Sequence, residues 1–165
     1  MFRLELNIVK VPIEEKPILN NLMQLYLYDF SEFMDCDVED NGLFGEYPYL
    51  DDYWISVEHR FPYFIKRDGK NVGFILVRYI DSSDTPHFSM AEFFIMKKYR
   101  KGGIGRQTAY YLFDSFPGKW EVAEIKENTP AQKFWRKIIS EYTNDHYKEI
   151  QKRGWDGPIQ TFITG

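Results

Sequence analysis

Residues 91–108 read Ala-Glu-Phe-Phe-Ile-Met-Lys-Lys-Tyr-Arg-Lys-Gly-Gly-Ile-Gly-Arg-Gln-Thr, which predicts an apolar strand, a basic glycine-rich turn and the start of a helix. Glycine lets backbone N–H groups approach a ligand closely, and a helix start adds N–H donors and a positive dipole end. The segment Lys97–Arg106 has five basic residues and no acidic one, although the chain has a formal net charge of -4. We therefore expect this turn to bind an anion such as phosphate.

Two common phosphate-binding motifs do not match this turn. A Walker loop requires Gly-Lys followed by Ser or Thr, and residues 97–108 contain no such pair. A dinucleotide-binding fingerprint requires a third small residue after Gly103-Ile-Gly105, without a basic run before it. The turn therefore belongs to another class of anion site.

The spacing of the turn resembles a known family signature. Arg100-x-x-Gly103-x-Gly105 is similar to the arginine/glutamine-x-x-glycine-x-glycine motif of the GNAT superfamily of acyl-CoA-dependent N-acyltransferases. About one strand later, Asn128-x-x-Ala131-x-x-Phe134-Trp135 resembles the second cofactor element of that superfamily. The resemblance covers roughly residues 72–139, and it implies an α/β fold of the α+β type, with a mixed, mostly antiparallel central sheet flanked by helices.

The hydrophobic pattern predicts alternating strands and helices, as such a fold requires. Strands are expected at residues 4–11, 61–66, 72–79, 88–96, 120–125, 142–150 and 158–163, and helices at 14–33, 104–116 and 128–140. No repeat or linker interrupts the chain, so we expect a single domain over residues 1–165.

Composition excludes several classes of function. No apolar run approaches the roughly 20 residues that span a bilayer, and a pI near 5.4 argues against nucleic acid as the main partner. The lone Cys36 and the absence of a secretory signal in Met1–Asn7 favour the cytoplasm. Asp35-x-Asp37-x-Glu39 lacks the glycine and terminal glutamate of a calcium loop, so we expect no metal.

Residues 31–59 form a second charge anomaly, because they contain no lysine or arginine. Their acidic residues are Glu32, Asp35, Asp37, Glu39, Asp40, Glu46, Asp51, Asp52 and Glu58. Aromatic residues such as Tyr47, Tyr49 and Trp54 lie between them. Two interpretations remain open: a solvated acidic loop, or the wall of a site that attracts a cationic amine by its field and by cation–π contacts.

The resemblance implies that acetyl-CoA is the acyl donor. Backbone N–H groups of the glycine turn would bind the pyrophosphate, the strand backbone before it would bind the pantetheine, and Asn128 would bond the pantetheine arm or cap its helix. The residues to which it assigns cofactor contacts are Phe94, Ile95, Met96, Arg100, Lys101, Gly102, Gly103, Ile104, Gly105, Arg106, Asn128, Ala131, Phe134 and Trp135.

Acetyl transfer to an amine also requires a base and an acid. The candidate base is Glu92, which lies among phenylalanines on the expected central strand, where burial would raise its pKa towards neutrality. The alternative is that Glu92 forms a salt bridge at the edge of the strand. Trp135 occupies the position at which the family often has an acidic tyrosine, so Tyr142 or water is the substitute acid. His87 follows Pro86 in an expected loop, so we expect His87 to lie at the surface.

The function that these features favour is direct transfer of an acetyl group from acetyl-CoA to a primary amine. The expected acceptor is a cationic small molecule or a protein side chain or terminus, and the expected state is a monomer or homodimer without nucleic-acid or membrane partners. Because Trp135 replaces the usual acid, a CoA-binding sensor or interaction module is the alternative. An enzyme that acts on another phosphate ligand is the third possibility.

Overall fold

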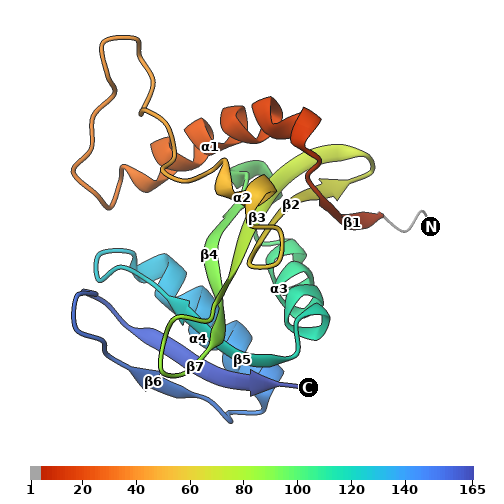
Figure 1. Cartoon of the computed structure of the whole chain (residues 1–165), viewed down its shortest axis with the longest axis vertical. Coiled ribbons are helices and arrows are strands. Elements are labelled where there is room, and N and C mark those ends of the chain that lie inside the picture. The colour runs from red at the N-terminus through yellow and green to blue at the C-terminus, as the bar shows by residue number, and fades with distance from the viewer. Residues whose placement is uncertain (1–4) are drawn as a thin grey trace. The chain divides into compact units, whose positions relative to one another are not determined.

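A computed structural model describes residues 5–165 (Figure 1), and its contacts divide the chain into two compact units. Unit 1 comprises the chain up to Leu76 together with Glu92–Met96, and unit 2 comprises Val77–Ala91 and Lys97–Gly165. The expectation of one domain stays a prediction.

Within the described residues, one seven-stranded sheet has the order β1-β2-β3-β4-β5-β7-β6. Its strands are β1 (Leu6–Lys10), β2 (Arg60–Arg67), β3 (Lys70–Ile80), β4 (His87–Ile95), β5 (Gly118–Ala123), β6 (Lys148–Ile150) and β7 (Ile159–Thr164). The pair β4–β5 is parallel, whereas β1–β2, β5–β7 and β6–β7 are antiparallel. The predicted class, a mixed and mostly antiparallel sheet with flanking helices, is confirmed. The expected start of the first strand at Leu4 lies outside the described residues.

Unit 1 is built on β1, β2 and the first part of β3, with three helical elements. These are η1 (Ile13–Glu15), α1 (Lys16–Phe30) and α2 (Asp52–Ile55). Leu19 and Met23 lie one turn apart on α1 and are almost fully buried, and each contributes roughly 1.5–3 kcal/mol by leaving water. The prediction that this helix reaches Phe33 is wrong. The N–H of Ser31 is shared between the carbonyls of Leu27 and Tyr28, which closes the last turn early.

A glycine lets β3 approach the end of β4 within unit 1. A Cβ added at Gly73 would lie 2.1 Å from the carbonyl oxygen of Phe94, so no larger residue fits there. The N–H of Met96 donates to the carbonyl of Val72 at 2.9 Å, which fixes the strand that precedes the glycine turn.

Unit 2 is organised around one aromatic side chain. Phe113 belongs to α3 (Ile104–Ser115), and its ring lies 5.0 Å from Trp120 of β5 and 4.9 Å from Phe162 of β7. It also lies 6.5 Å from Trp135 and 5.1 Å from Tyr142, both on α4 (Thr129–Thr143). The two helices therefore pack side by side on one face of β5 and β7.

The end of α4 differs from the sequence-based expectation. The helix continues past Ser140 to Thr143, because the first residue in the left-handed conformation is Asn144, whose N–H bonds the carbonyl of Ser140. The predicted strand at 142–150 is therefore wrong in its first part, and β6 begins only at Lys148.

The surface position expected for His87 is also wrong. His87 is the first residue of β4 and is 4% exposed. Its Nε2 lies 3.0 Å from a carboxylate oxygen of Glu121 on β5, and its Nδ1 lies 2.8 Å from the carbonyl of Thr85. Lys152 donates to the same Glu121 carboxylate at 2.6 Å. The pairing of β4 with β5 thus encloses a histidine that local sequence places in a loop.

Candidate active site

The glycine turn of unit 2 has the backbone expected of an anion cradle. A short 3-10 helix, η2 (Lys97–Tyr99), leads into it, and Gly103 adopts φ 83°, a left-handed conformation that favours glycine. Gly103 is the N-cap of α3 and provides no side-chain cap for the first-turn N–H groups. Around Gly103, the nearest atom to an added Cβ is Nε2 of Gln107 at 4.0 Å, so the turn is open.

The basic side chains of this turn are not equivalent. The guanidinium of Arg106 lies 2.7 Å from a carboxylate oxygen of Glu141 on α4, so an anion would compete with that pair. The ammonium of Lys98 lies 5.3 Å from the ring centre of Tyr99. Lys101 is exposed and has φ 65°, which turns the backbone towards the glycines. Anion binding by the backbone and basic side chains of this turn stays a prediction.

The start of α4 carries the second predicted motif. Oδ1 of Asn128 accepts a hydrogen bond from the N–H of Ala131 at 3.1 Å, so Asn128 is the N-cap of the helix. Trp135 is 6% exposed and its ring lies 4.9 Å from that of Phe134. Cofactor contacts by these four residues stay a prediction.

Tyr142, the candidate acid, is engaged within unit 2. Its hydroxyl donates to Oδ1 of Asp114 at 2.6 Å, and its ring lies 5.1 Å from that of Tyr110. Burial raises the pKa of Tyr142, and the hydrogen bond and charge of Asp114 raise it further. For Tyr142 to protonate a thiolate, its bond to Asp114 has to break, and this role stays a prediction.

Glu92, the candidate base, lies in unit 1 between two tyrosines. The hydroxyl of Tyr26, on α1, donates to Oε2 in a short hydrogen bond, and the hydroxyl of Tyr47 donates to Oε1 at 2.9 Å. No lysine, arginine or histidine pairs with Glu92 among the described residues, so the alternative of a strand-edge salt bridge is wrong. Burial raises the pKa of Glu92, while the two phenols act in the opposite direction.

Sequence analysis missed both tyrosines as partners of Glu92. Tyr26 lies within the helix expected at residues 14–33, and Tyr47 is one of the aromatic residues of the acidic segment. They lie 66 and 45 residues from Glu92 along the chain, and no local pattern links positions so far apart.

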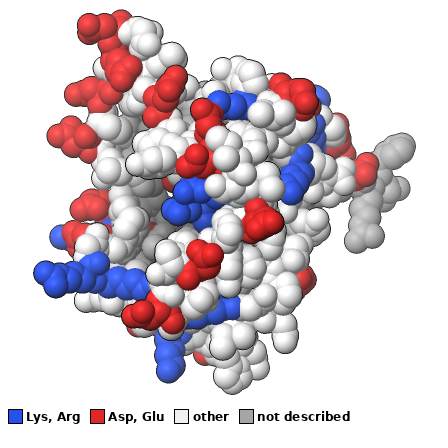
Figure 2. Space-filling view, viewed as in Figure 1, with Lys and Arg blue, Asp and Glu red and all other residues white. Residues whose placement is uncertain are grey.

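The acidic segment is attached to unit 1 at defined points. Gln24 of α1 donates through Nε2 to the carbonyl of Gly45 at 2.8 Å and accepts from the N–H of Phe44 at 2.8 Å. Asp51 forms an ion pair with Lys16. Figure 2 shows acidic side chains gathered on the loop that follows α1 and projects from it. Its end is thus fixed near Glu92, whereas most of its carboxylates face solvent.

Comparison with known proteins places the chain in a family. Residues 21–139 match the acetyltransferase (GNAT) family. The chain belongs to the GNAT family. The reaction of this family is acetyl-CoA-dependent acyl transfer. No curated protein matches the chain.

Solved GNAT structures share the fold at low sequence identity. An acetyltransferase from Thermus thermophilus has a TM-score of 0.66 and 13% identity, with 96% of each chain covered. The PaiA N-acetyltransferase from Thermoplasma acidophilum, in complex with coenzyme A, has a TM-score of 0.65 and 12% identity, covering 96% of this chain and 99% of that one. Aminoglycoside acetyltransferase AAC(6')-Ib, in complex with coenzyme A and kanamycin, has a TM-score of 0.67 and 11% identity, covering 96% and 95%.

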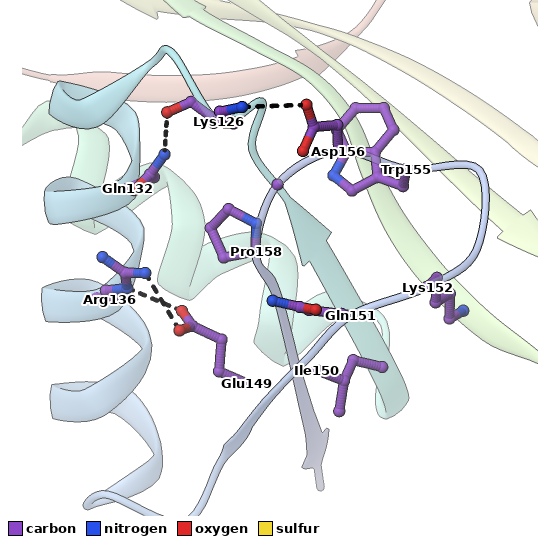
Figure 3. Close-up of a pocket in the computed structure, with 11 residues that line it drawn as sticks. Lys126, Gln132, Arg136, Glu149, Ile150, Gln151, Lys152, Trp155, Asp156 and Pro158 are labelled. Atoms are coloured by element: carbon purple, nitrogen blue, oxygen red, sulfur yellow. Dashed lines mark hydrogen bonds and ion pairs between the residues drawn. The ribbon is translucent and has the colours of Figure 1, made fainter.

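A cavity in unit 2 of this GNAT chain is separate from the predicted site residues. It has a volume of about 440 Å³ and lies between α4 and the segment from β6 to β7 (Figure 3). Its charges pair with each other: Arg136 contacts Glu149 at 2.8 Å, and Lys126 lies 3.7 Å from Asp156. None of the predicted cofactor residues lines it.

A second buried glutamate lies close to this cavity. Glu124 is 4% exposed, and Oε1 accepts from Nε2 of Gln160 at 2.8 Å, a nitrogen that also donates to Glu149 at 2.9 Å. Burial raises the pKa of Glu124 to about 8, against the opposing effects of Gln160 and Arg136. Its Oε2 is buried without a partner among the described residues.

Two further properties bear on the expected partners. In the part of the chain that the structure describes, no helix combines the length and apolar character needed to cross a bilayer. Over the same residues, no three His, Cys, Asp or Glu side chains are grouped so that they could hold a metal ion.

Proposed function

We propose that this GNAT chain transfers the acetyl group of acetyl-CoA directly to a primary amine of a cationic acceptor, with Glu92 as the base. The observation that carries the proposal is the carboxylate of Glu92, which is partly buried and accepts hydrogen bonds from two neutral donors. Burial raises its proton affinity towards that of a useful base, and the two donors keep the ionised form accessible.

For the donor, we propose that the N–H groups of the open turn around Gly103 and Gly105 bind the pyrophosphate of acetyl-CoA. The left-handed glycine and the uncapped first turn of α3 support this assignment. The side chains of Phe94 and Ile95 are buried, which leaves the strand backbone as the group that contacts the pantetheine. Lys101 is exposed and adds positive charge.

The proton balance of the reaction follows from these groups. The ammonium of the acceptor gives a proton to Glu92, and the neutral amine attacks the thioester carbonyl carbon. The C–N bond forms, the nitrogen of the tetrahedral intermediate gives its second proton to water, the C–S bond breaks, and the CoA thiolate takes a proton. Because Trp135 offers only an indole N–H, this last proton comes from water or from Tyr142 after it leaves Asp114.

For the acceptor, the acidic segment favours a cation. Its carboxylates lie on a projecting loop whose end is held by Gln24 and Tyr47, the latter in contact with Glu92 (Figure 2). Amines with a second positive charge, such as polyamines, aminoglycosides or lysine side chains, would be drawn to it by long-range attraction. The complex of AAC(6')-Ib with kanamycin shows that one protein of this fold takes such an acceptor.

The deciding experiment measures thiol release from acetyl-CoA over a panel of monocationic, polycationic, neutral and anionic amines. Release with polycationic amines, at a lower KM than with neutral ones, is the expected result. The alternative, a CoA-binding sensor, is motivated by Trp135 at the usual acid position. Calorimetric binding of CoA without thiol release over the whole panel would favour the sensor and contradict the enzyme.

The remaining expectations are part of the same proposal. The protein acts as a monomer or homodimer in the cytoplasm, without a metal, and binds neither nucleic acid nor a membrane. The chain has a pI near 5.4, which opposes attraction to phosphate backbones.

A further inference from the structure

The carboxylate of Glu92 accepts hydrogen bonds from Tyr26 on α1 and from Tyr47 in the acidic segment, and these two side chains are held in place by different contacts. Tyr26 is fixed by rings on several sides, with centroids 5.6 Å from Phe30, 5.6 Å from Phe74 and 5.7 Å from Phe94. Each such aromatic contact adds to the packing of the tyrosine ring. These ring contacts hold the hydroxyl of Tyr26 in place beside Glu92.

Tyr47, within the acidic segment, donates to Oε1 of Glu92 at 2.9 Å. The residues before it are attached to α1 by the amide of Gln24, which bonds Phe44 and Gly45, and by the ring of Phe44, which lies 6.5 Å from that of Tyr28. The segment has turns instead of helix or strand between α1 and α2, so its position depends on side-chain contacts such as these. The contact of Tyr47 with Glu92 thus depends on whether this segment is docked.

We propose that Tyr26 and Tyr47 are positioning residues that hold Glu92 ionised and oriented towards the amine, and that docking of residues 44–47 on Gln24 prepares the base. The inference rests on the proposed function, because it assigns to Glu92 the proton of the acceptor. It adds a physical link between the acidic segment and the base.

The physical reason lies in the balance between burial and hydrogen bonding. A buried carboxyl without donors keeps its proton and cannot accept another. One phenol on each oxygen acts against this effect, and each carboxylate oxygen has a further lone pair that can accept a hydrogen bond from an ammonium N–H. Burial raises the pKa of Tyr26, and Glu92, Tyr47 and Asp29 raise it further. Tyr26 therefore donates a hydrogen bond without losing its proton.

The test uses two substitutions, each with a matched control two residues away on the same element. Tyr26→Phe and Tyr47→Phe remove one hydroxyl each and keep the rings. Tyr28→Phe on α1 and Tyr49→Phe in the acidic segment remove hydroxyls of side chains that are 67% and 73% exposed. Thermal unfolding of all four variants checks that the fold is kept.

The first readout is the pKa of Glu92 itself. It is measured by a carbon-13 NMR titration of protein labelled at the glutamate carboxyl carbons. The signal that is missing in Glu92→Gln identifies the residue. We expect the pKa of Glu92 to rise by about one unit in each of Tyr26→Phe and Tyr47→Phe, because a donor to the charged form is lost. The control variants should leave it unchanged.

The second readout is the acid limb of kcat/KM for the preferred amine, which should move to higher pH by the same amount. A Glu92 pKa that stays constant in both variants would overturn the proposal. A Glu92 pKa that rises while the acid limb of kcat/KM stays in place would also overturn it. If the parent releases no thiol with any amine, the proposed function fails, and the NMR titration still decides whether the phenols control Glu92.

A third variant tests the docking step alone. Gln24→Ala removes both hydrogen bonds to residues 44 and 45 without touching Glu92, and Asn20→Ala, at an exposed position one turn earlier on α1, is its control. We expect Gln24→Ala to raise the pKa of Glu92 in the same direction as Tyr47→Phe, by a smaller amount. An unchanged pKa in Gln24→Ala would show that docking does not prepare the base.

Discussion

Glu92 in unit 1 and Glu124 in unit 2 are both enclosed glutamates whose pKa is raised by burial, yet their surroundings differ. Glu92 has a phenol donor on each oxygen. Glu124 has one amide donor on Oε1, while its Oε2 is buried without a partner among the described residues. Burial favours the protonated form of each carboxyl, and donors to the charged form act against this effect, so we expect the two donors of Glu92 to favour its use as a base.

The largest effect is expected from removing the charge of Glu92. Glu92→Gln keeps the shape and should lower kcat/KM by about 10²–10⁴, the usual contribution of a general base. The parent rate should fall as the pH drops through the raised pKa of Glu92, and this acid limb should vanish in the variant. Glu124→Gln is the matched control and should change kcat/KM by less than about twofold. An equal loss of kcat/KM in both variants would mean that Glu92 contributes no more to the reaction than Glu124 does.

The next effect concerns the donor site of unit 2. Gly103→Glu should weaken acetyl-CoA binding at least about 100-fold in calorimetry, because a carboxylate would occupy the open turn and repel the pyrophosphate. Gly154→Glu is a close control, since Gly103 and Gly154 have φ of +83° and +88°, and a Cβ at Gly154 meets nothing within 4 Å. Unchanged CoA affinity in a folded Gly103→Glu variant would refute the assignment of the cradle.

A smaller effect is expected from Glu124 on the pH dependence of the free energy of unfolding. The folded pKa of Glu124 is about 8, above its ordinary value of 4.5, so the folded state holds a proton that the unfolded state loses. Stability should therefore fall as the pH rises from about 4.5 to about 8. Glu124→Gln removes this loss and should be more stable than the parent at pH 9, by an amount on the order of a few kcal/mol. Urea unfolding at pH 5 and pH 9 measures it, and equal pH dependence in both proteins would contradict it.

Local signals predicted the parts of the molecule that depend on neighbouring residues. The glycine turn, the start of α3 at Ile104 and the cap by Asn128 all follow from residue types at fixed short spacings. The seven-stranded sheet followed from the hydrophobic pattern together with the family resemblance. These features need no knowledge of long-range contacts.

The features that were missed depend on contacts between distant segments. His87 is buried because β4 pairs with β5 in a register that brings Phe88 beside Trp120, which no pattern around Pro86 discloses. The donors to Glu92 come from an amphipathic helix and a loop, where tyrosine is ordinary. The end of α4 was misplaced because Ser140 favours a helix end less than Asn144, which adopts the left-handed conformation.

The smallest effect is expected from the acidic segment, whose charges lie in solvent. Asp51 is a poor test position because it pairs with Lys16, so the better variant combines Asp35→Asn with Asp37→Asn, both exposed. Exposed charges interact weakly in water, and we expect the KM for a polycationic amine to rise only about two- to fivefold at low salt.

Salt and a matched surface variant show whether this effect is electrostatic attraction to the segment. The difference in KM should disappear at physiological ionic strength, where charges are screened over about 8 Å. Asp84→Asn with Glu127→Gln alters the net charge of the chain equally at two exposed positions of unit 2, and it should leave KM nearly unchanged. If this control raises KM as much as the variant in the segment, the net charge of the protein attracts the acceptor and the segment has no special part. If neither variant alters KM at any salt concentration, residues 31–59 are a solvated loop, and the contact of Tyr47 with Glu92 is its remaining connection to the reaction.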